Sequence, residues 1–120
     1  MATFLIGKHN RIALLGAGTR GQFRREDQMG CAWVAEKLVK AGYISETPET
    51  DEYIKKWTGV DPNVIREGRS ADYLRATGQE RDLEFILEHI DDLNVVPRLI
   101  DGELVPASPA SVETTSSVIK

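Results

Sequence analysis

Three glycines, an arginine and two adjacent carboxylates lie close together near the start of the chain. An apolar run from Ile12 to Leu15 leads into Gly16-Ala-Gly-Thr-Arg-Gly21, and the acids Glu26 and Asp27 follow. Glycine lets backbone N–H groups approach an oxyanion, and the N-terminus of a following helix adds partial positive charge. Adjacent carboxylates supply the hard oxygen ligands that Mg²⁺ prefers. The segment predicts a phosphate and Mg²⁺ site where a strand passes into a helix.

Each of these residues has a predicted role in that site. Backbone N–H groups around Gly18 and Gly21 would surround the phosphate, and Arg20 would pair with its oxygens. Glu26 and Asp27 would hold Mg²⁺ directly or through water. Two alternatives stay open: the acids could simply complement a helix N-terminus, and the glycines could form a tight turn that binds no ligand.

The segment from Gly16 to Gly21 also matches the G-x-G-x-x-G pattern of dinucleotide-binding folds. That pattern requires a helix that opens at once and an acid about 20 residues later, at the end of a second strand. Here the helical pattern begins only near Arg25, and Glu36 falls inside that helix. A nucleotide-binding domain is therefore the least favoured interpretation.

The composition narrows the class of protein. A chain of 120 residues with 41% hydrophobic and 28% charged residues fits one globular domain. Its net charge of −4 argues against nucleic acid as a partner. No apolar run approaches the roughly 18 residues that span a membrane, and the first residues do not resemble a signal peptide. A single cysteine, Cys31, excludes an internal disulfide and suits the cytoplasm, where we expect the protein.

Local patterns predict helices in the middle of the chain and strands at both ends. Thr47 and Pro48 mark one helix start, Ser70 is the expected N-cap of another, and Asp101-Gly102 is a two-residue hairpin turn. The predicted strands cover residues 2–6, 11–15, 95–100 and 104–105, the predicted helices cover 26–41, 47–57, 70–77 and 81–90, and a short turn covers 61–67.

These elements predict an α/β fold, a three-layer α/β/α-like arrangement in which helices pack on a small mixed sheet. We expect one domain over residues 1–106 and a flexible tail over 107–120, where Ser, Thr, Pro and Ala dominate. So thin a sheet, with an exposed hairpin edge, predicts a homo-oligomer or a second chain that covers it.

Several segments together carry a resemblance to a known family. They are Leu15-Gly-Ala-Gly-Thr-Arg-Gly-Gln-Phe23, Glu26-Asp27, Cys31-Ala32, Ser70-Ala-Asp-Tyr-Leu74, Gly78, Asp82-Leu-Glu-Phe85, Asp91, Val96-Pro97 and Asp101-Gly102. In this order and spacing, roughly residues 12–105 resemble the C-terminal half of the 2-phosphosulfolactate phosphatase family.

The resemblance implies a Mg²⁺-dependent phosphatase, or half of one, with an α/β fold. It implies hydrolysis of the phosphate ester of 2-phospho-3-sulfolactate or a similar small phosphorylated hydroxy acid, a reaction of coenzyme M biosynthesis. The threonine-rich segments of the family's N-terminal half have no counterpart here. The isolated chain is therefore expected to lack part of the catalytic site, and a second chain could supply it.

Further residues are candidates for contact with this small anionic substrate. Arg24, with Arg25, could bind a second anionic group such as a sulfonate, although a solvated helix face also explains both. Arg69 and Ser70 are further candidates, and no catalytic residue is assigned. The main alternative function is a non-catalytic assembly module that keeps the fold and associates through its exposed sheet edge.

Overall fold

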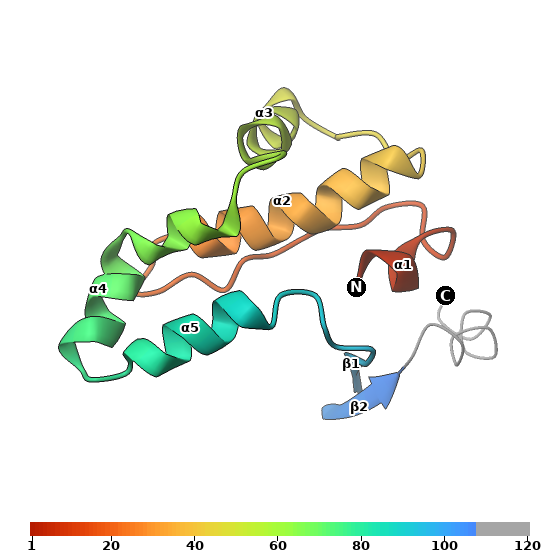
Figure 1. Ribbon diagram of the computed structural model, residues 1–120. Coiled ribbons are helices and arrows are strands. Elements are labelled where there is room, and N and C mark those ends of the chain that lie inside the picture. The colour runs from red at the N-terminus through yellow and green to blue at the C-terminus, as the bar shows by residue number, and fades with distance from the viewer. Residues whose placement is uncertain (108–120) are drawn as a thin grey trace.

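The computed structural model describes residues 1–107 as a group of helices with one small sheet (Figure 1). The mixed α/β class is as the sequence predicts. Within this range the elements are α1 (Ala2–Leu5), α2 (Arg25–Lys40), α3 (Pro48–Trp57), the 3₁₀ helix η1 (Pro62–Arg66), α4 (Arg69–Ala76), α5 (Glu80–Glu88), β1 (Val96–Ile100) and β2 (Glu103–Ala107).

The two strands predicted at the start of the chain are wrong. Residues 2–6 form the short helix α1 and its end, and residues 11–18 have no regular secondary structure. The described chain pairs neither segment with another strand, and a short apolar run does not hold a strand without a partner for its backbone. The apolar residues are used differently, because Phe4 is buried and packs against Val96 of the hairpin.

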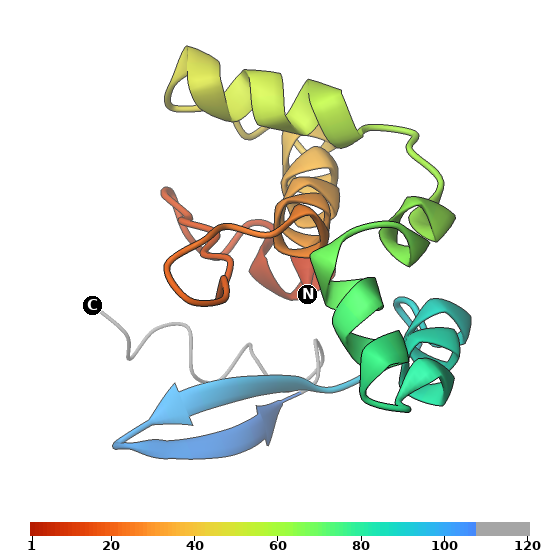
Figure 2. The same ribbon diagram turned by 90° about the vertical axis from the view of Figure 1, so that its left-hand side faces the viewer.

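Helix α2 is the centre of the molecule and begins and ends within one residue of the predicted bounds. Met29 and Ala32 on one of its faces pack against Trp57 at the end of α3, and all three side chains are buried. Helix α3 lies on one side of α2, and the β1–β2 hairpin lies on the other (Figures 1 and 2).

Capping residues explain where the next elements begin. Thr47 caps α3, since its side-chain oxygen accepts a hydrogen bond from the backbone N–H of Thr50 at 3.2 Å, and Pro48 is the first helical residue. Asp61 caps η1 in the same way, accepting from the N–H of Asn63 at 2.8 Å. Both starts are as predicted.

The predicted hairpin is present, and its two faces differ. Antiparallel pairing places Leu99 opposite Leu104 and Pro97 opposite Pro106, and all four point to the same face because side chains alternate along a strand. Leu99 and Leu104 are each 72% exposed. The other face carries Val96, which is buried on α1. The hairpin therefore presents an uncovered apolar face, which we call the outer hairpin face.

The end of the described chain corrects the predicted tail by one residue. Ala107, placed in the tail by the sequence analysis, is the last residue of β2. The rest of the predicted flexible tail, residues 108–120, lies outside the described residues. Among the described helices, none combines the length and the apolar character needed to cross a membrane.

Candidate functional site

A cleft of about 270 Å³ lies where the N-terminal ends of α2 and α4 come together. The two walls are at least 39 positions apart in the sequence, from Glu26 to Ile65, so only the fold brings them together. One wall consists of Gln22, Phe23, Arg24, Arg25 and Glu26, and the other of Ile65, Glu67, Gly68, Arg69, Ser70 and Ala71.

Both helices begin at the cleft without a side-chain cap. The N-cap residues are Arg24 for α2 and Gly68 for α4: the Arg24 side chain accepts no hydrogen bond from the first turn, and glycine has no side chain that could. Gly68 has φ 129°, a conformation that L side chains rarely adopt. The first N–H groups of a helix lack intrahelical partners and carry partial positive charge. Two such ends at one cleft favour a bound anion.

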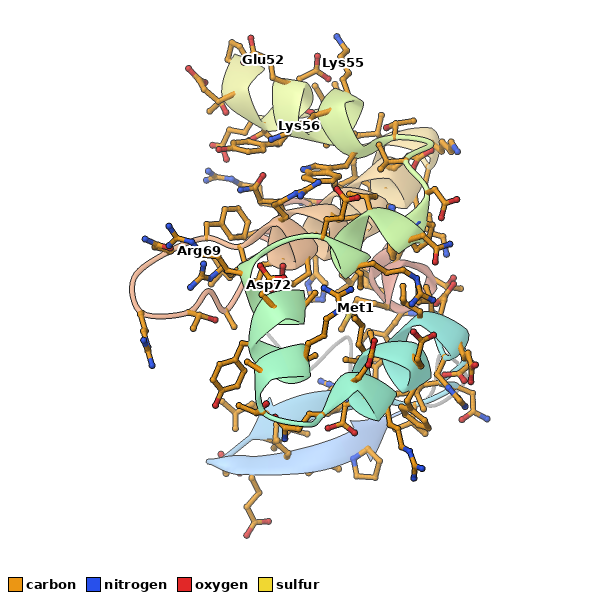
Figure 3. All side chains as sticks on the ribbon, turned by 60° about the vertical axis from the view of Figure 1, so that its left-hand side comes forward. Met1, Glu52, Lys55, Lys56, Arg69 and Asp72 are labelled. Carbon is orange, nitrogen blue, oxygen red and sulfur yellow. The ribbon has the colours of Figure 1, made fainter. Side chains whose placement is uncertain are left out.

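The cleft lining carries a positive balance in an otherwise acidic protein. Three arginines face two glutamates there, which leaves a formal charge of +1 against −4 for the whole chain. Arg25 Nη1 donates to the carbonyl oxygen of Glu67 at 3.4 Å, and Arg69 Nη1 donates to Gln22 Oε1 at 3.2 Å. Figure 3 shows Arg69 at the start of α4, beside the loop that precedes α2. These two arginines therefore connect the walls of the cleft.

The third arginine has an unused polar atom. Arg24 Nε is buried and has no hydrogen-bond partner within the described part of the chain. A buried donor without a partner is unusual, because it loses water and gains nothing in exchange. Arg24 therefore has capacity for a further acceptor at the cleft.

The carboxylates of the two adjacent acids, Glu26 and Asp27, have different hydrogen-bond partners. The Glu26 carboxylate lines the cleft and accepts a hydrogen bond from the hydroxyl of Ser70. Asp27 Oδ2 instead accepts from the backbone N–H of Gly18 at 3.1 Å. The prediction that Ser70 is the N-cap of its helix is wrong, because Gly68 takes that position and the Ser70 hydroxyl finds a long-range acceptor.

The glycine turn lies beside the cleft rather than in its lining. Thr19 and Gln22 exchange two backbone hydrogen bonds of 2.8 and 3.0 Å, and the residues between them, Arg20 and Gly21, both have positive φ. The N–H of Gly18 is already bonded to Asp27. Of the predicted site residues, the structure thus brings together Arg24, Arg25, Glu26, Arg69 and Ser70 at the cleft. It leaves Gly18, Arg20, Gly21 and Asp27 outside the cleft lining.

Four residues of the second wall were not predicted as site residues, and two of them, Glu67 and Gly68, contribute through their backbone. A glycine directly before a helical pattern is a weak start signal, and Ser70 offered a stronger one two positions later. The role of Glu67 depends on its backbone carbonyl, which bonds Arg25 across the cleft. A main-chain acceptor leaves no mark on residue type, so this contact had no signal in the sequence.

The described residues fit Mg²⁺ only in part. They contain no group of three or more His, Cys, Asp or Glu side chains that could hold a metal ion. Protein Mg²⁺ sites often use one or two carboxylates and complete the shell with waters and substrate phosphates. Glu26 lines the cleft and supplies one such carboxylate, whereas Asp27 lies outside the lining and has one of its oxygens bonded to the N–H of Gly18.

Asp91 and Cys31 lie away from the cleft. Asp91 Oδ2 pairs with Lys37 Nζ at 3.0 Å, and this hydrogen bond lowers the pKa of Asp91. The Cys31 thiol is partly buried on α2, and burial, helped by the charge of Asp27, raises its pKa. A raised pKa suits a packing residue better than a nucleophile.

Comparison with known proteins identifies the family. The sequence model of 2-phosphosulpholactate phosphatase matches residues 1–102 of the 120-residue chain, which includes both walls of the cleft. The chain therefore belongs to the 2-phosphosulpholactate phosphatase family, and the resemblance found in the sequence is confirmed. Neither the curated proteins nor the solved structures gave a significant match.

Proposed function

We propose that the cleft between α2 and α4 binds the phosphate group of a small phosphorylated hydroxy acid. Membership of the family indicates a phosphatase-like function, and 2-phospho-3-sulfolactate is the substrate that the family name suggests. The observation that supports the proposal is the meeting of two uncapped helix N-termini with Arg24, Arg25 and Arg69. Together they provide N–H donors and positive charge for an oxyanion.

The charge pattern suits a substrate with several anionic groups. Phosphosulfolactate carries a phosphate, a sulfonate and a carboxylate, and three arginines around one cleft could each pair with one of them. Arg20, on the neighbouring glycine turn, is a further candidate for the group that projects from the cleft. Gly18 and Gly21 would then shape the turn that carries Arg20 instead of surrounding the phosphate.

Mg²⁺ dependence is part of the proposal. Glu26 would provide one ligand at the cleft, and Asp27 would provide a second through the oxygen that is not bonded to Gly18. A bound Mg²⁺ would offset negative charge on the phosphoryl oxygens. Ser70 would keep the Glu26 carboxylate on the cleft side of α2.

We also propose that a second chain or a second copy of this chain completes the molecule. Only ten hydrophobic residues of the described chain are buried, whereas the outer hairpin face is open. A two-stranded sheet is marginal by itself. Strands from another chain would extend the sheet toward the three-layer α/β/α arrangement. A cytoplasmic enzyme of coenzyme M biosynthesis is the setting in which we place this assembly.

The same observation supports a second candidate function. The outer hairpin face would also serve a non-catalytic module whose role is to assemble with another protein. The two functions differ in the cleft: an assembly module has no need of the positive charge there. Phosphate binding and phosphatase activity therefore distinguish them.

The test measures inorganic phosphate and sulfolactate binding by calorimetry, with and without Mg²⁺, and phosphate release from phosphosulfolactate. Arg69→Gln removes a charge from the cleft, and Arg20→Gln removes the same charge from the turn beside it. We expect Arg69→Gln to weaken phosphate binding about ten-fold, as for the loss of a charged hydrogen bond, and Arg20→Gln to have a smaller effect. If Arg69→Gln and the unmodified chain bind phosphate with equal affinity, the phosphate does not bind in the cleft.

A further inference from the structure

A network of side-chain bonds joins η1, α4 and α5 just outside the cleft. The guanidinium group of Arg66 binds the Glu84 carboxylate through two hydrogen bonds, and its Nε donates to Asn63 Oδ1 at 2.8 Å. Arg75 Nη2 donates to the carbonyl oxygen of Arg66 at 2.6 Å. Arg66 is thus held through its side chain and its backbone, by residues that do not line the cleft.

This network ends where the second wall of the cleft begins. Glu67 follows Arg66 directly and offers its carbonyl oxygen to Arg25, and Gly68 is the N-cap of α4. A movement of Arg66 would therefore shift the acceptor of Arg25 and the first N–H groups of α4 together. Ser70, the partner of Glu26, would move with the same helix start.

The geometry of the Arg66–Glu84 pair distinguishes it from the other ion pairs of the described chain. A paired fork fixes the orientation of both planar groups, whereas one amine–carboxylate contact leaves them free to rotate. Lys37–Asp91 and Lys55–Asp51 are contacts of the second kind, at 3.0 and 2.6 Å. The hydrogen bonds of the fork lower the pKa of Glu84 and raise that of Arg66, so both stay charged at neutral pH.

We propose that Glu84 is a positioning residue for the anion cleft: through Arg66 it fixes the Glu67–Gly68 corner and the start of α4. This inference rests on the proposed function for the identity of the ligand. The fixed corner itself is a property of the protein without ligand. The two can therefore fail separately.

The experiment compares Glu84→Gln with Asp51→Asn in the full chain. Both variants replace one ion-paired carboxylate by an amide, but Asp51 pairs within α3 and lies away from the cleft. We measure inorganic phosphate binding by calorimetry and backbone amide shifts and hydrogen exchange by NMR. For Glu84→Gln we expect about ten-fold weaker phosphate binding, the lower end of the loss when residues that orient metal ligands are replaced.

The backbone amides of Gly68, Arg69 and Ser70 report on the start of α4 itself, and a change in global stability alone would not single them out. We expect their shifts to change and their exchange to quicken in Glu84→Gln relative to Asp51→Asn, at a temperature where both variants are folded. Unchanged amides with unchanged phosphate affinity would overturn the proposal. If the unmodified chain binds no phosphate, the proposed function is wrong. The shifts and exchange rates of the three amides then test the positioning role by themselves.

A second variant covers the case in which Glu84→Gln does not fold. Arg66→Lys keeps the charge but loses the two-bond fork. It is expected to alter the same three amides and to weaken phosphate binding. Wild-type behaviour of Arg66→Lys in both measurements would also overturn the proposal, because a point charge would then be sufficient.

Discussion

The hydroxyl of Ser70 donates a hydrogen bond to the carboxylate of Glu26, across 44 positions of sequence. The contact joins the first turns of α2 and α4, the two helices whose starts form the cleft. It gives Glu26 a fixed place among positively charged groups. The cleft therefore has an internal carboxylate next to the place where an external anion is proposed to bind.

Removing either partner of this contact should destabilise the protein. We expect Ser70→Ala to lower the free energy of unfolding by about 1 kcal/mol, since hydrogen bonds to charged groups exceed neutral ones but this one is only partly buried. Chemical denaturation of Ser70→Ala, Glu26→Ala and the double variant measures the coupling. Additive effects of the two substitutions would show that the contact contributes nothing to stability.

Gly18 and Gly21 should differ in their tolerance of alanine, although both have positive φ. A Cβ at Gly18 would lie 2.7 Å from the carbonyl oxygen of Gln22, while one at Gly21 would meet nothing within 4 Å. We expect Gly21→Ala to cost about 1 kcal/mol from backbone strain alone and Gly18→Ala to cost about 2–3 kcal/mol. Thermal and chemical unfolding check the order. A larger loss for Gly21→Ala would contradict the described turn.

The Cys31 thiol should react slowly. Burial and then the charge of Asp27 raise its pKa above the ordinary 9.0, so little thiolate is present at neutral pH. Asp27→Asn removes the second cause and should modestly speed alkylation. Glu26→Gln, its matched neighbour, is not among the causes and should leave the rate unchanged. The alkylation rate against that of free glutathione gives the comparison, and a faster reaction than glutathione in the unmodified chain would contradict it.

Acid should weaken the protein through its paired carboxylates. The hydrogen bond from Arg66 lowers the pKa of Glu84 below its ordinary 4.5, and the bond from Lys37 lowers that of Asp91 below 3.8. A carboxyl group with a lowered folded pKa adds stability above its unfolded pKa and loses it as pH falls through the folded value. The free energy of unfolding should therefore decline as the pH drops below about 4.5.

Glu84→Gln provides the control for this pH dependence. It should be less stable than the unmodified chain at pH 7, and the difference should shrink as pH falls, because protonation removes the same charge in the unmodified chain. Denaturation at a series of pH values measures the difference. A gap that stays constant down to strongly acidic pH would show that the Glu84 charge has no role.

The outer hairpin face should control association. We expect the chain to associate as its concentration rises, and Leu99→Asp to oppose this by placing a charge on an apolar face. Ile44→Asp makes the same change at a residue that is 91% exposed between α2 and α3. Sedimentation velocity over a range of concentrations compares the three. Equal association in both variants would place the interface elsewhere.

Local signals predicted most of the helices and the hairpin. Thr47-Pro48, Asp61-Pro62 and Asp101-Gly102 each mark a start or a turn through their own backbone preferences, and the structure has all three. The strands predicted near the N-terminus failed for a different reason. A strand depends on a partner elsewhere in the chain, and the residues of a single segment do not report whether that partner exists.

The candidate site was predictable in its residue types but not in its arrangement. Arginine, serine and acid at the starts of two helices indicated anion chemistry, and five of the predicted residues line the cleft. The separation of Glu26 from Asp27 was not visible, because it depends on two different donors: Ser70 bonds Glu26, and the backbone N–H of Gly18 bonds Asp27. The role of Gly68 was not visible either, because it depends on the positive φ of its backbone at the start of α4.

The contacts that α2 makes with α3 and with the start of α4 differ in kind, and this difference affects how the protein responds to a bound anion. Buried Met29 and Trp57 pack α2 against α3. The two walls of the cleft are instead joined by hydrogen bonds for which water competes: Arg25 reaches Glu67 on the α4 wall, and Arg69 and Ser70 reach the α2 wall. Separating the two walls of the cleft therefore requires less free energy than separating α2 from α3. An anion held by arginines from both walls would act as a cross-link between the starts of α2 and α4. The ligand would then stabilise the structure as well as react, and the protein without ligand would be the less stable of the two forms.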